Sequence, residues 1–135
     1  MGSRIMHAII AKKVAEALFI KDKTSFVLGG IAADATSNKD ASHFYKGALQ
    51  NFTRAIDYEG FYQKYQDIAD SDYIQGYYTH LIADDLWLQG FNIPWLRNRM
   101  AENPPVLNAY HQDFKLLNGK LIEYYARRCY RFTFQ

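Results

Sequence analysis

The first third of the chain alternates apolar runs with polar breaks, and the apolar runs carry helical spacing. Residues 4–20 place apolar side chains three and four positions apart, opposite a lysine-rich face, which predicts an amphipathic helix. Residues 26–33 predict a second, short helix that Thr24 or Ser25 could cap. The turn-forming residues at 34–40 predict a loop between this helix and the next.

Helical spacing returns beyond the loop, with one interruption. A third helix is expected to begin near Asp40, whereas residues 50–57 are interpreted as a loop or a frayed helix. The other predicted elements are helices at 58–69, 73–90 (capped by Ser71-Asp72 and stopped by Gly90), 92–100 (with Pro94 in its first turn) and 106–128, and an extended tail at 130–135. We therefore predict an all-α fold, a single compact bundle of five to seven helices forming one domain over 1–135, with no strand before the tail.

Composition narrows the class of protein further. The chain has 135 residues, of which 49% are hydrophobic and 16% aromatic, and this is typical of a globular domain. Its formal net charge of +2 is too balanced to favour nucleic acid as a partner. The single cysteine, Cys129, excludes an intramolecular disulfide and a cysteine-based zinc site. No secretory signal or transmembrane segment is recognisable, so a cytoplasmic location is expected, and the oligomeric state stays open.

The strongest chemical signal is His80 with Asp84, four positions later in an apolar, aromatic stretch. Residues four apart lie on the same face of a helix, so an imidazole and a carboxylate would both point inward there. A buried carboxylate is costly unless a cation meets it. Further candidate ligands stand on other segments: His7, Asp34, His43 and, less clearly, His111. Together they predict an inward-facing metal site in the bundle, built from nitrogen and oxygen ligands.

Each candidate also has an interpretation without a metal. His7 beside an apolar face is typical of a satisfied core histidine, and Asp34 is typical of a cap or turn residue. His80 and Asp84 could form a buried hydrogen bond. His111, at the start of the last helix, is about as easily a surface residue as a ligand to a second metal.

The set resembles the zinc-dependent phospholipase C family through three blocks of sequence. These are Phe26-Val-Leu-Gly-Gly-Ile-Ala-Ala-Asp34, Lys39-Asp-Ala-Ser-His43-Phe44 and Tyr77-Tyr-Thr-His80-Leu-Ile-Ala-Asp84, preceded by His7. The resemblance covers roughly residues 5–90 and implies an all-α bundle around a metal cluster, a fold also used by S1/P1-type nucleases.

The resemblance also implies roles for individual residues. It gives Asp34, His43 and His80 to one metal, and His7 with Asp84 to a neighbouring one. The chain lacks the later His-x-x-x-Glu pair of that family, since Lys115 stands four residues after His111. One or two ions are therefore expected, zinc first, with manganese or iron possible.

The expected chemistry is hydrolysis of a small phosphorylated substrate, a phosphodiester or phosphomonoester. Metal ions lower the pKa of bound water and offset negative charge at phosphorus. Asp34 is expected to act both as ligand and as proton acceptor, and Lys39 is a candidate phosphate contact, although a solvated loop lysine explains it somewhat better. Two alternatives stay open: a non-catalytic module that binds a metal or a partner, and an S1/P1-like nuclease.

Overall fold

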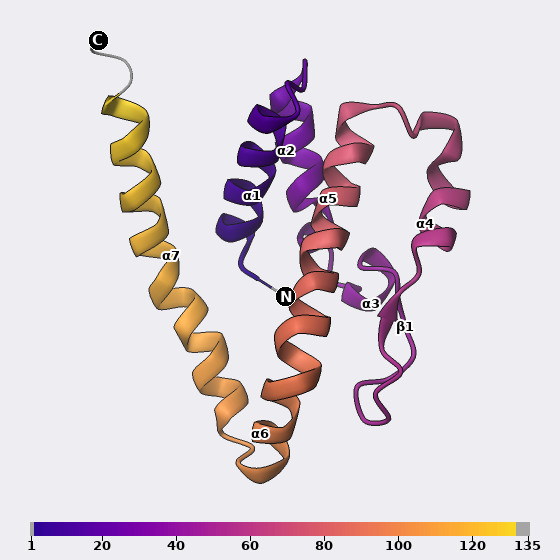
Figure 1. Cartoon of the computed structure of the whole chain (residues 1–135), viewed down its shortest axis with the longest axis vertical. Helices are drawn as coiled ribbons and strands as arrows, with labels where there is room; N and C mark the ends of the chain where they lie inside the picture. The colour runs from indigo at the N-terminus through magenta and orange to yellow at the C-terminus, as the bar shows by residue number, and fades with distance from the viewer. Residues whose placement is uncertain (1, 132–135) are drawn as a thin grey trace.

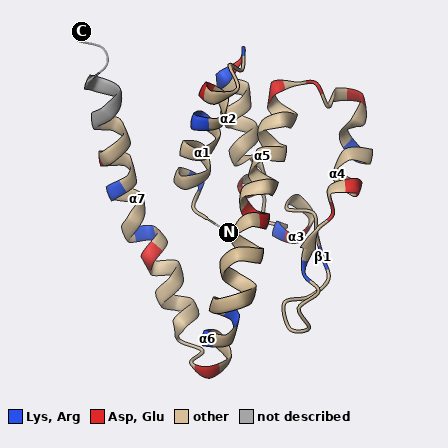
Figure 2. Ribbon diagram, in the orientation of Figure 1, with Lys and Arg blue, Asp and Glu red and all other residues tan. Residues whose placement is uncertain are grey.

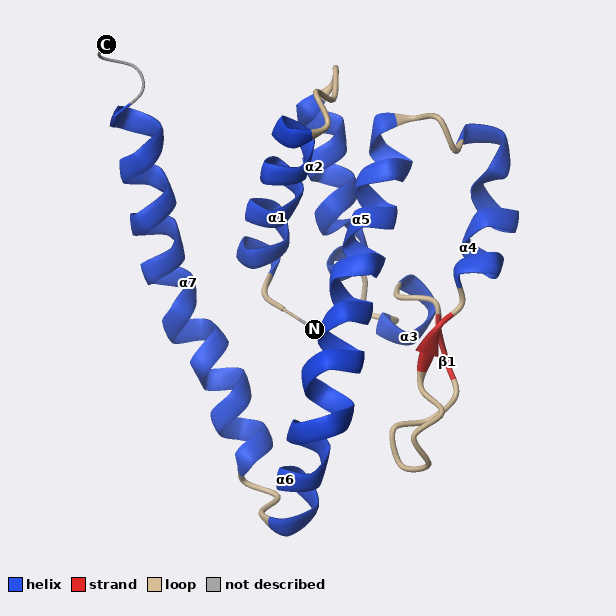
Figure 3. Ribbon diagram, in the orientation of Figure 1, coloured by secondary structure: helices blue, strands red, loops and turns tan. Residues whose placement is uncertain are grey.

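The computed structural model describes residues 2–131, with side chains up to residue 126, and it is almost entirely helical. Its elements, in chain order, are α1 (Arg4–Ala17), α2 (Lys23–Ala32), the 3-10 turn η1 (Ala33–Ala35), α3 (Lys39–Ser42), β1 (Tyr45–Lys46), β2 (Ala55–Ile56), α4 (Tyr58–Tyr65), the 3-10 turn η2 (Gln66–Ile68), α5 (Asp72–Trp87), the π-helical segment η3 (Leu88–Leu96), α6 (Arg97–Glu102) and α7 (Val106–Arg131). Helix α5 lies between α2 and α4, and α7 runs outside α1 (Figures 1 and 3). The predicted all-α class is confirmed.

Short polar side chains set where the helices begin. The Ser71 hydroxyl accepts a hydrogen bond from the Ile74 N–H at 3.2 Å, as predicted for the start of α5. Helix α2 begins earlier than predicted, because Asp22, and not Thr24 or Ser25, is its cap. The Asp22 carboxylate accepts from the Ser25 N–H at 3.0 Å.

Helices α2 and α5 touch main chain to main chain, and glycine permits this contact. A Cβ on Gly29 would lie 1.9 Å from the Tyr73 carbonyl oxygen, and one on Gly76 would lie 1.9 Å from the Phe26 carbonyl oxygen. Neither position therefore accepts any side chain without separating the helices. Because α2 and α5 are so close, the carbonyl of Gly30 comes within reach of side chains on α5.

The prediction that a helix ends at Gly90 is wrong. The chain continues helically from α5 through η3 into α6, and nothing lies within 4 Å of the place where a Cβ on Gly90 would be. Pro94 sits inside η3. Proline has no N–H to donate, and the wider π-helical turns accommodate it without breaking the helix.

The prediction that no strand precedes the tail is also wrong. Residues 45–46 and 55–56 form a two-stranded antiparallel ladder in which Tyr45 pairs with Ile56. Gly47, with φ of +71°, turns the chain out of β1, and a Cβ there would lie 2.1 Å from the Thr53 carbonyl oxygen. Strands of two residues are too short for alternation of apolar and polar residues to reveal them. Of the predicted tail, residues 130 and 131 belong to α7 and residues 132–135 lie outside the described chain.

An aromatic core holds α3, α4 and α5 together. Phe44 and Phe61 meet edge to face at 5.2 Å between ring centroids, and Tyr77 lies 5.3 Å from Phe61. The Tyr77 hydroxyl donates to the Ser42 carbonyl oxygen, which ties α5 to the end of α3. None of the described helices combines the length and the apolar composition needed to cross a bilayer.

Candidate metal centre

Four segments bring five of the predicted ligand side chains into one cluster at the middle of α5. They are His7 from α1, Asp34 from η1, His43 at the end of α3, and His80 and Asp84 from α5. His80 and Asp84 are each 1% exposed, and His7 and His43 are each 4% exposed. Water therefore has little access to these four side chains, and their charges must be satisfied within the cluster or by a bound cation.

Asp84 is the carboxylate that all three histidines share. Its Oδ1 lies 3.2 Å from Nε2 of His7, and its Oδ2 lies 3.3 Å from Nε2 of both His43 and His80. The rings of His7 and His80 stack with their centroids 3.7 Å apart. The three imidazoles thus present the same nitrogen, Nε2, to one carboxylate.

The other ring nitrogen of two histidines is fixed by the main chain. Nδ1 of His80 lies 2.7 Å from the Gly30 carbonyl oxygen, and Nδ1 of His43 lies 2.8 Å from the Lys39 carbonyl oxygen. A carbonyl oxygen can only accept, so both Nδ1 atoms carry the hydrogen. In the neutral rings, Nε2 then carries a lone pair that is directed into the cluster.

These two lone pairs point at each other. Nε2 of His43 and Nε2 of His80 are 3.2 Å apart, and Oδ1 of Asp34 lies 3.3 Å from Nε2 of His43. Nitrogen lone pairs and carboxylate oxygens at these distances repel unless positive charge lies between them. Either a proton or a metal ion can supply that charge. A ligand histidine that donates its second N–H to a main-chain carbonyl is the usual arrangement in metal sites.

Acid–base equilibria in the cluster favour ionised carboxylates. Burial alone would raise the pKa of Asp84, but its contacts with the His7 and His80 rings outweigh burial and hold the pKa well below its usual range. The pKa of Asp34 is likewise lowered, since the His43 contact and the neighbouring imidazoles outweigh burial. Burial lowers the pKa of His7 and so favours its neutral ring. Anionic carboxylates and a neutral imidazole are the forms that bind metal ions.

Two groups of three side chains have ligand atoms within 4.8 Å of one another. One group is His7, Asp34 and His80; the other is His43, His80 and Asp84. Both contain His80, so the five residues form one continuous cluster. This division differs from the one that the phospholipase C resemblance implies, in which His7 pairs with Asp84 apart from the rest.

A cavity of about 280 Å³ opens onto the cluster from the side of Asp34. Its lining includes Asp34, His43, Lys39 and Tyr45. The Lys39 ammonium donates to the Asp34 carbonyl oxygen at 2.6 Å and lies 3.7 Å from Asp34 Oδ1. Oδ2 of Asp34 is buried and has no hydrogen-bond partner among the described residues.

The structure places His111 apart from the other predicted ligands. It is exposed on α7 and contributes to the wall of the cavity, but it belongs to neither group of closely spaced ligand atoms in the described chain. Its ring lies 5.5 Å from that of Tyr110.

Tyr45 is a cavity residue that the sequence did not indicate. Its ring stacks on His43 at 5.4 Å, and its hydroxyl is buried without a hydrogen-bond partner in the described chain. Burial raises the pKa of Tyr45, so the hydroxyl stays protonated and can donate. The carbonyls of Gly30 and Lys39 were also missed, because main-chain atoms leave no signal in residue type.

No protein-family model, no curated protein and no solved structure matches this chain. The resemblance to the zinc-dependent phospholipase C family therefore rests on the quoted residues alone. The side chains themselves support a narrower statement: buried His7, His43, His80 and Asp84 could bind a metal ion.

Proposed function

We propose that this chain is a metal-dependent hydrolase of phosphate esters, with its centre at His7, Asp34, His43, His80 and Asp84. The observation that carries the proposal is the 3.2 Å approach of the His43 and His80 Nε2 atoms, whose rings are both locked by main-chain carbonyls. Three imidazoles and two carboxylates form a donor set suited to zinc, and to manganese or iron. The spacing of the ligand atoms fits one ion at Nε2 of His80, which has a single lone pair, and a second ion would use ligands other than His80.

The cavity residues have separate tasks in this proposal. A bound zinc ion would lower the pKa of water and offset charge at the phosphoryl group. Asp34 lines the cavity and its Oδ2 has no hydrogen-bond partner in the described chain, so it can accept a proton from an attacking water. Lys39 and the Tyr45 hydroxyl line the same cavity and can donate to phosphoryl oxygens.

A non-catalytic metal centre is the main alternative, and the burial of four of the five ligands favours it. Structural metal sites are closed, whereas catalytic sites keep a position open to water. The 280 Å³ cavity against Asp34 and His43 supports the catalytic reading. A nuclease is less favoured, since Figure 2 shows the Lys and Arg residues of the described chain spread over several helices. Binding of single-stranded nucleic acid usually uses a continuous basic stripe.

Metal content is the first test. Protein purified without a metal-affinity tag should contain about one or two equivalents of transition metal by elemental analysis. His80→Ala should lose most of it, whereas His111→Ala, which alters a cavity-wall histidine outside the cluster, should retain it. A native protein that holds no metal and takes up neither zinc, manganese nor iron contradicts the proposal.

Turnover separates catalysis from a structural metal. The native protein should hydrolyse a chromogenic phosphodiester such as bis(4-nitrophenyl) phosphate, and Asp34→Asn should lose this activity while staying folded. Bound metal without turnover of phosphodiester, phosphomonoester or single-stranded DNA would favour the non-catalytic centre. Cleavage of single-stranded DNA alone would favour the nuclease.

A further inference from the structure

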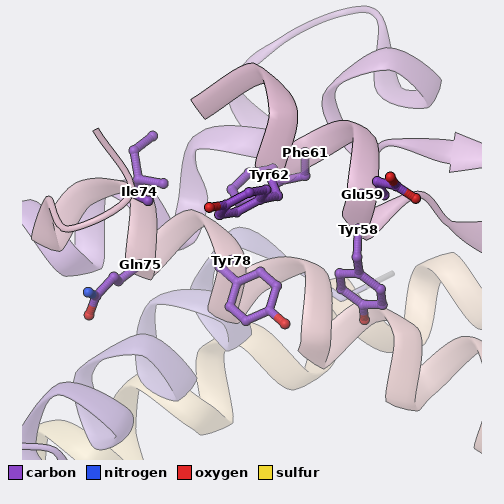
Figure 4. Close-up of a pocket in the computed structure, with 8 residues that line it drawn as sticks. Tyr58, Glu59, Phe61, Tyr62, Ile74, Gln75 and Tyr78 are labelled. Carbon is purple, nitrogen blue, oxygen red and sulfur yellow. The ribbon is translucent and has the colours of Figure 1, made fainter. Parts of the chain in front are cut away.

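A second cavity, of about 480 Å³, lies between α4 and α5, away from the metal centre. We name it the α4–α5 pocket. Its lining is Tyr58, Glu59, Phe61, Tyr62, Ala69, Ile74, Gln75 and Tyr78. Figure 4 shows the tyrosine rings between the two helices, with the Glu59 carboxylate at one end and directed away from the rings. Half of the lining residues are thus aromatic, and their only formal charge is negative.

The aromatic rings of the pocket hold one another in place. Tyr78 lies 5.7 Å from Tyr58 in an edge-to-face arrangement and 5.9 Å from Phe61 in a stacked one. Phe61 is 5% exposed and anchors the floor, whereas Tyr62 and Tyr78 are 61% and 43% exposed and present ring surface to solvent. A fixed floor and accessible tyrosines are what a ligand-binding site needs.

Negative charge lies next to these rings at Tyr58, whose hydroxyl donates to Oδ2 of Asp85 at 2.8 Å. Glu59 also borders the pocket, and its carboxylate accepts a hydrogen bond from the side-chain amide of Gln63 at 3.3 Å. A carboxylate that accepts from a phenol adds electron density to its ring, which strengthens the attraction of the ring face for a cation. No Lys or Arg is among the residues that line the pocket.

Six other aromatic rings of the described chain carry a cation of their own. Arg54 lies over Tyr45 with its guanidinium 4.2 Å from the ring centroid, and the Lys64 ammonium lies 5.3 Å from the centroid of Tyr65. Further pairs of this kind are Lys13 with Tyr125, Lys64 with Phe44, Arg97 with Phe52 and Arg99 with Trp95. In the described chain no such contact is made to Tyr58, Tyr62 or Tyr78. The α4–α5 pocket is thus an acidic aromatic cluster to which the protein supplies no cation.

We propose that the α4–α5 pocket binds a small organic cation of the quaternary ammonium type. The alkyl groups of such an ion pack against the rings, and its diffuse charge is met by the ring faces, with Asp85 behind Tyr58 and Glu59 at the rim adding negative potential. A metal ion is excluded as the ligand, because Glu59 is the one strong oxygen ligand in the lining. The site is independent of the metal centre, and binding should be the same in protein treated with a chelator.

The test compares two probes of similar shape and different charge. Tetramethylammonium chloride should shift the NMR signals of the Tyr58, Tyr62 and Tyr78 rings in a saturable manner. At matched ionic strength, tert-butanol should bind at least about fivefold more weakly, because it lacks the charge. Equal affinity for the two probes, or no saturable shift, overturns the proposal.

Variants on the rim separate binding from folding. Tyr78→Leu should weaken tetramethylammonium binding about fivefold, and Glu59→Gln about threefold. Tyr73→Leu is the matched control, since Tyr73 is 41% exposed on the same helix but does not line the pocket. Full affinity in Tyr78→Leu and in Glu59→Gln would overturn the proposal.

A second copy of the chain is the competing occupant of an exposed aromatic face. If copies cover the pocket, the same tyrosine signals should shift on dilution of the protein without any added ligand. Sedimentation should then show a dimer that Tyr78→Leu weakens. That result contradicts a free ligand site, whereas concentration-independent spectra support it.

Discussion

The candidate metal centre and the α4–α5 pocket both place aromatic rings near carboxylates, but they differ in what holds the rings. In the metal centre the imidazoles are at most 4% exposed, and main-chain carbonyls fix His43 and His80 through Nδ1. In the pocket the ring of Tyr78 contacts the rings of Tyr58 and Phe61, and Tyr62 is 61% exposed. Fixed nitrogens at fixed distances suit a small ion with strict geometry, whereas loosely held ring faces suit a larger, diffuse charge.

The largest expected effect comes from removing the charge that the three histidines share. Asp84→Asn keeps the shape of the side chain but leaves the Nε2 atoms of His7, His43 and His80 facing an amide. We expect metal binding to fall below detection and the free energy of unfolding to drop by about 3 kcal/mol. Elemental analysis and urea unfolding followed by circular dichroism measure the two effects.

The neighbouring residue provides the control for this substitution. Asp85→Asn alters a carboxylate one position along α5 that bonds to Tyr58 at the pocket and not to the histidines. It should leave the metal content unchanged and weaken binding of an organic cation at the pocket. Equal metal loss in both variants would show that α5, and not the charge of Asp84, determines metal binding.

A smaller effect is expected from the main-chain contact that supports the centre. In Gly76→Ala the new Cβ would lie 1.9 Å from the Phe26 carbonyl oxygen, so α2 must move away from α5. The Gly30 carbonyl would then no longer hold Nδ1 of His80. We expect about 2 kcal/mol of destabilisation and roughly tenfold weaker metal binding, with no change at the pocket.

Gly90→Ala tests whether the effect of Gly76→Ala comes from the lost contact between α2 and α5 or from replacing a helical glycine in general. Apart from the backbone of its own helix, nothing lies within 4 Å of the added Cβ, so this variant should be as stable as the native protein or more stable by up to about 1 kcal/mol. Urea unfolding and zinc titration of both variants decide the matter. A native-like Gly76→Ala protein would refute the close approach of α2 and α5.

The helical class and five residues of the cluster could be predicted from the sequence, because both predictions depend on side-chain type. Helical spacing predicted His80 and Asp84 on one face of a helix, and in α5 Nε2 of His80 lies 3.3 Å from Oδ2 of Asp84. Gly90 failed as a stop signal because nothing crowds it, and the helix passes through Pro94 in a π-helical segment. Residue type alone does not determine where a helix ends, because the residues that follow can pack well while they stay helical.

The features that the sequence could not predict depend on contacts between distant segments. The Gly30 carbonyl meets His80 only because Gly29 and Gly76 allow two helices to touch, and neither glycine signals a ligand by itself. Tyr45 reaches the cavity from a strand of two residues, below the length at which a pattern can be recognised. The α4–α5 pocket escaped notice for a different reason: tyrosines at helical spacing predict a packed face and do not show whether it is filled.

The smallest effect is expected for Tyr45, a tyrosine that lines the cavity beside the candidate metal centre. Tyr45→Phe removes a buried hydroxyl that has no partner in the described chain, so stability should be unchanged or rise by about 1 kcal/mol. The ring that stacks on His43 is kept, and metal content should not change. If the hydroxyl donates to the phosphoryl group of a substrate, turnover of a chromogenic phosphodiester should fall about fivefold, mainly in kcat.

Tyr77→Phe is a useful comparison, because that hydroxyl has a partner in the Ser42 carbonyl and its loss should lower stability without acting on the substrate directly. Turnover unaffected in Tyr45→Phe would mean that this hydroxyl, like the tyrosines of the α4–α5 pocket, serves something other than the metal centre.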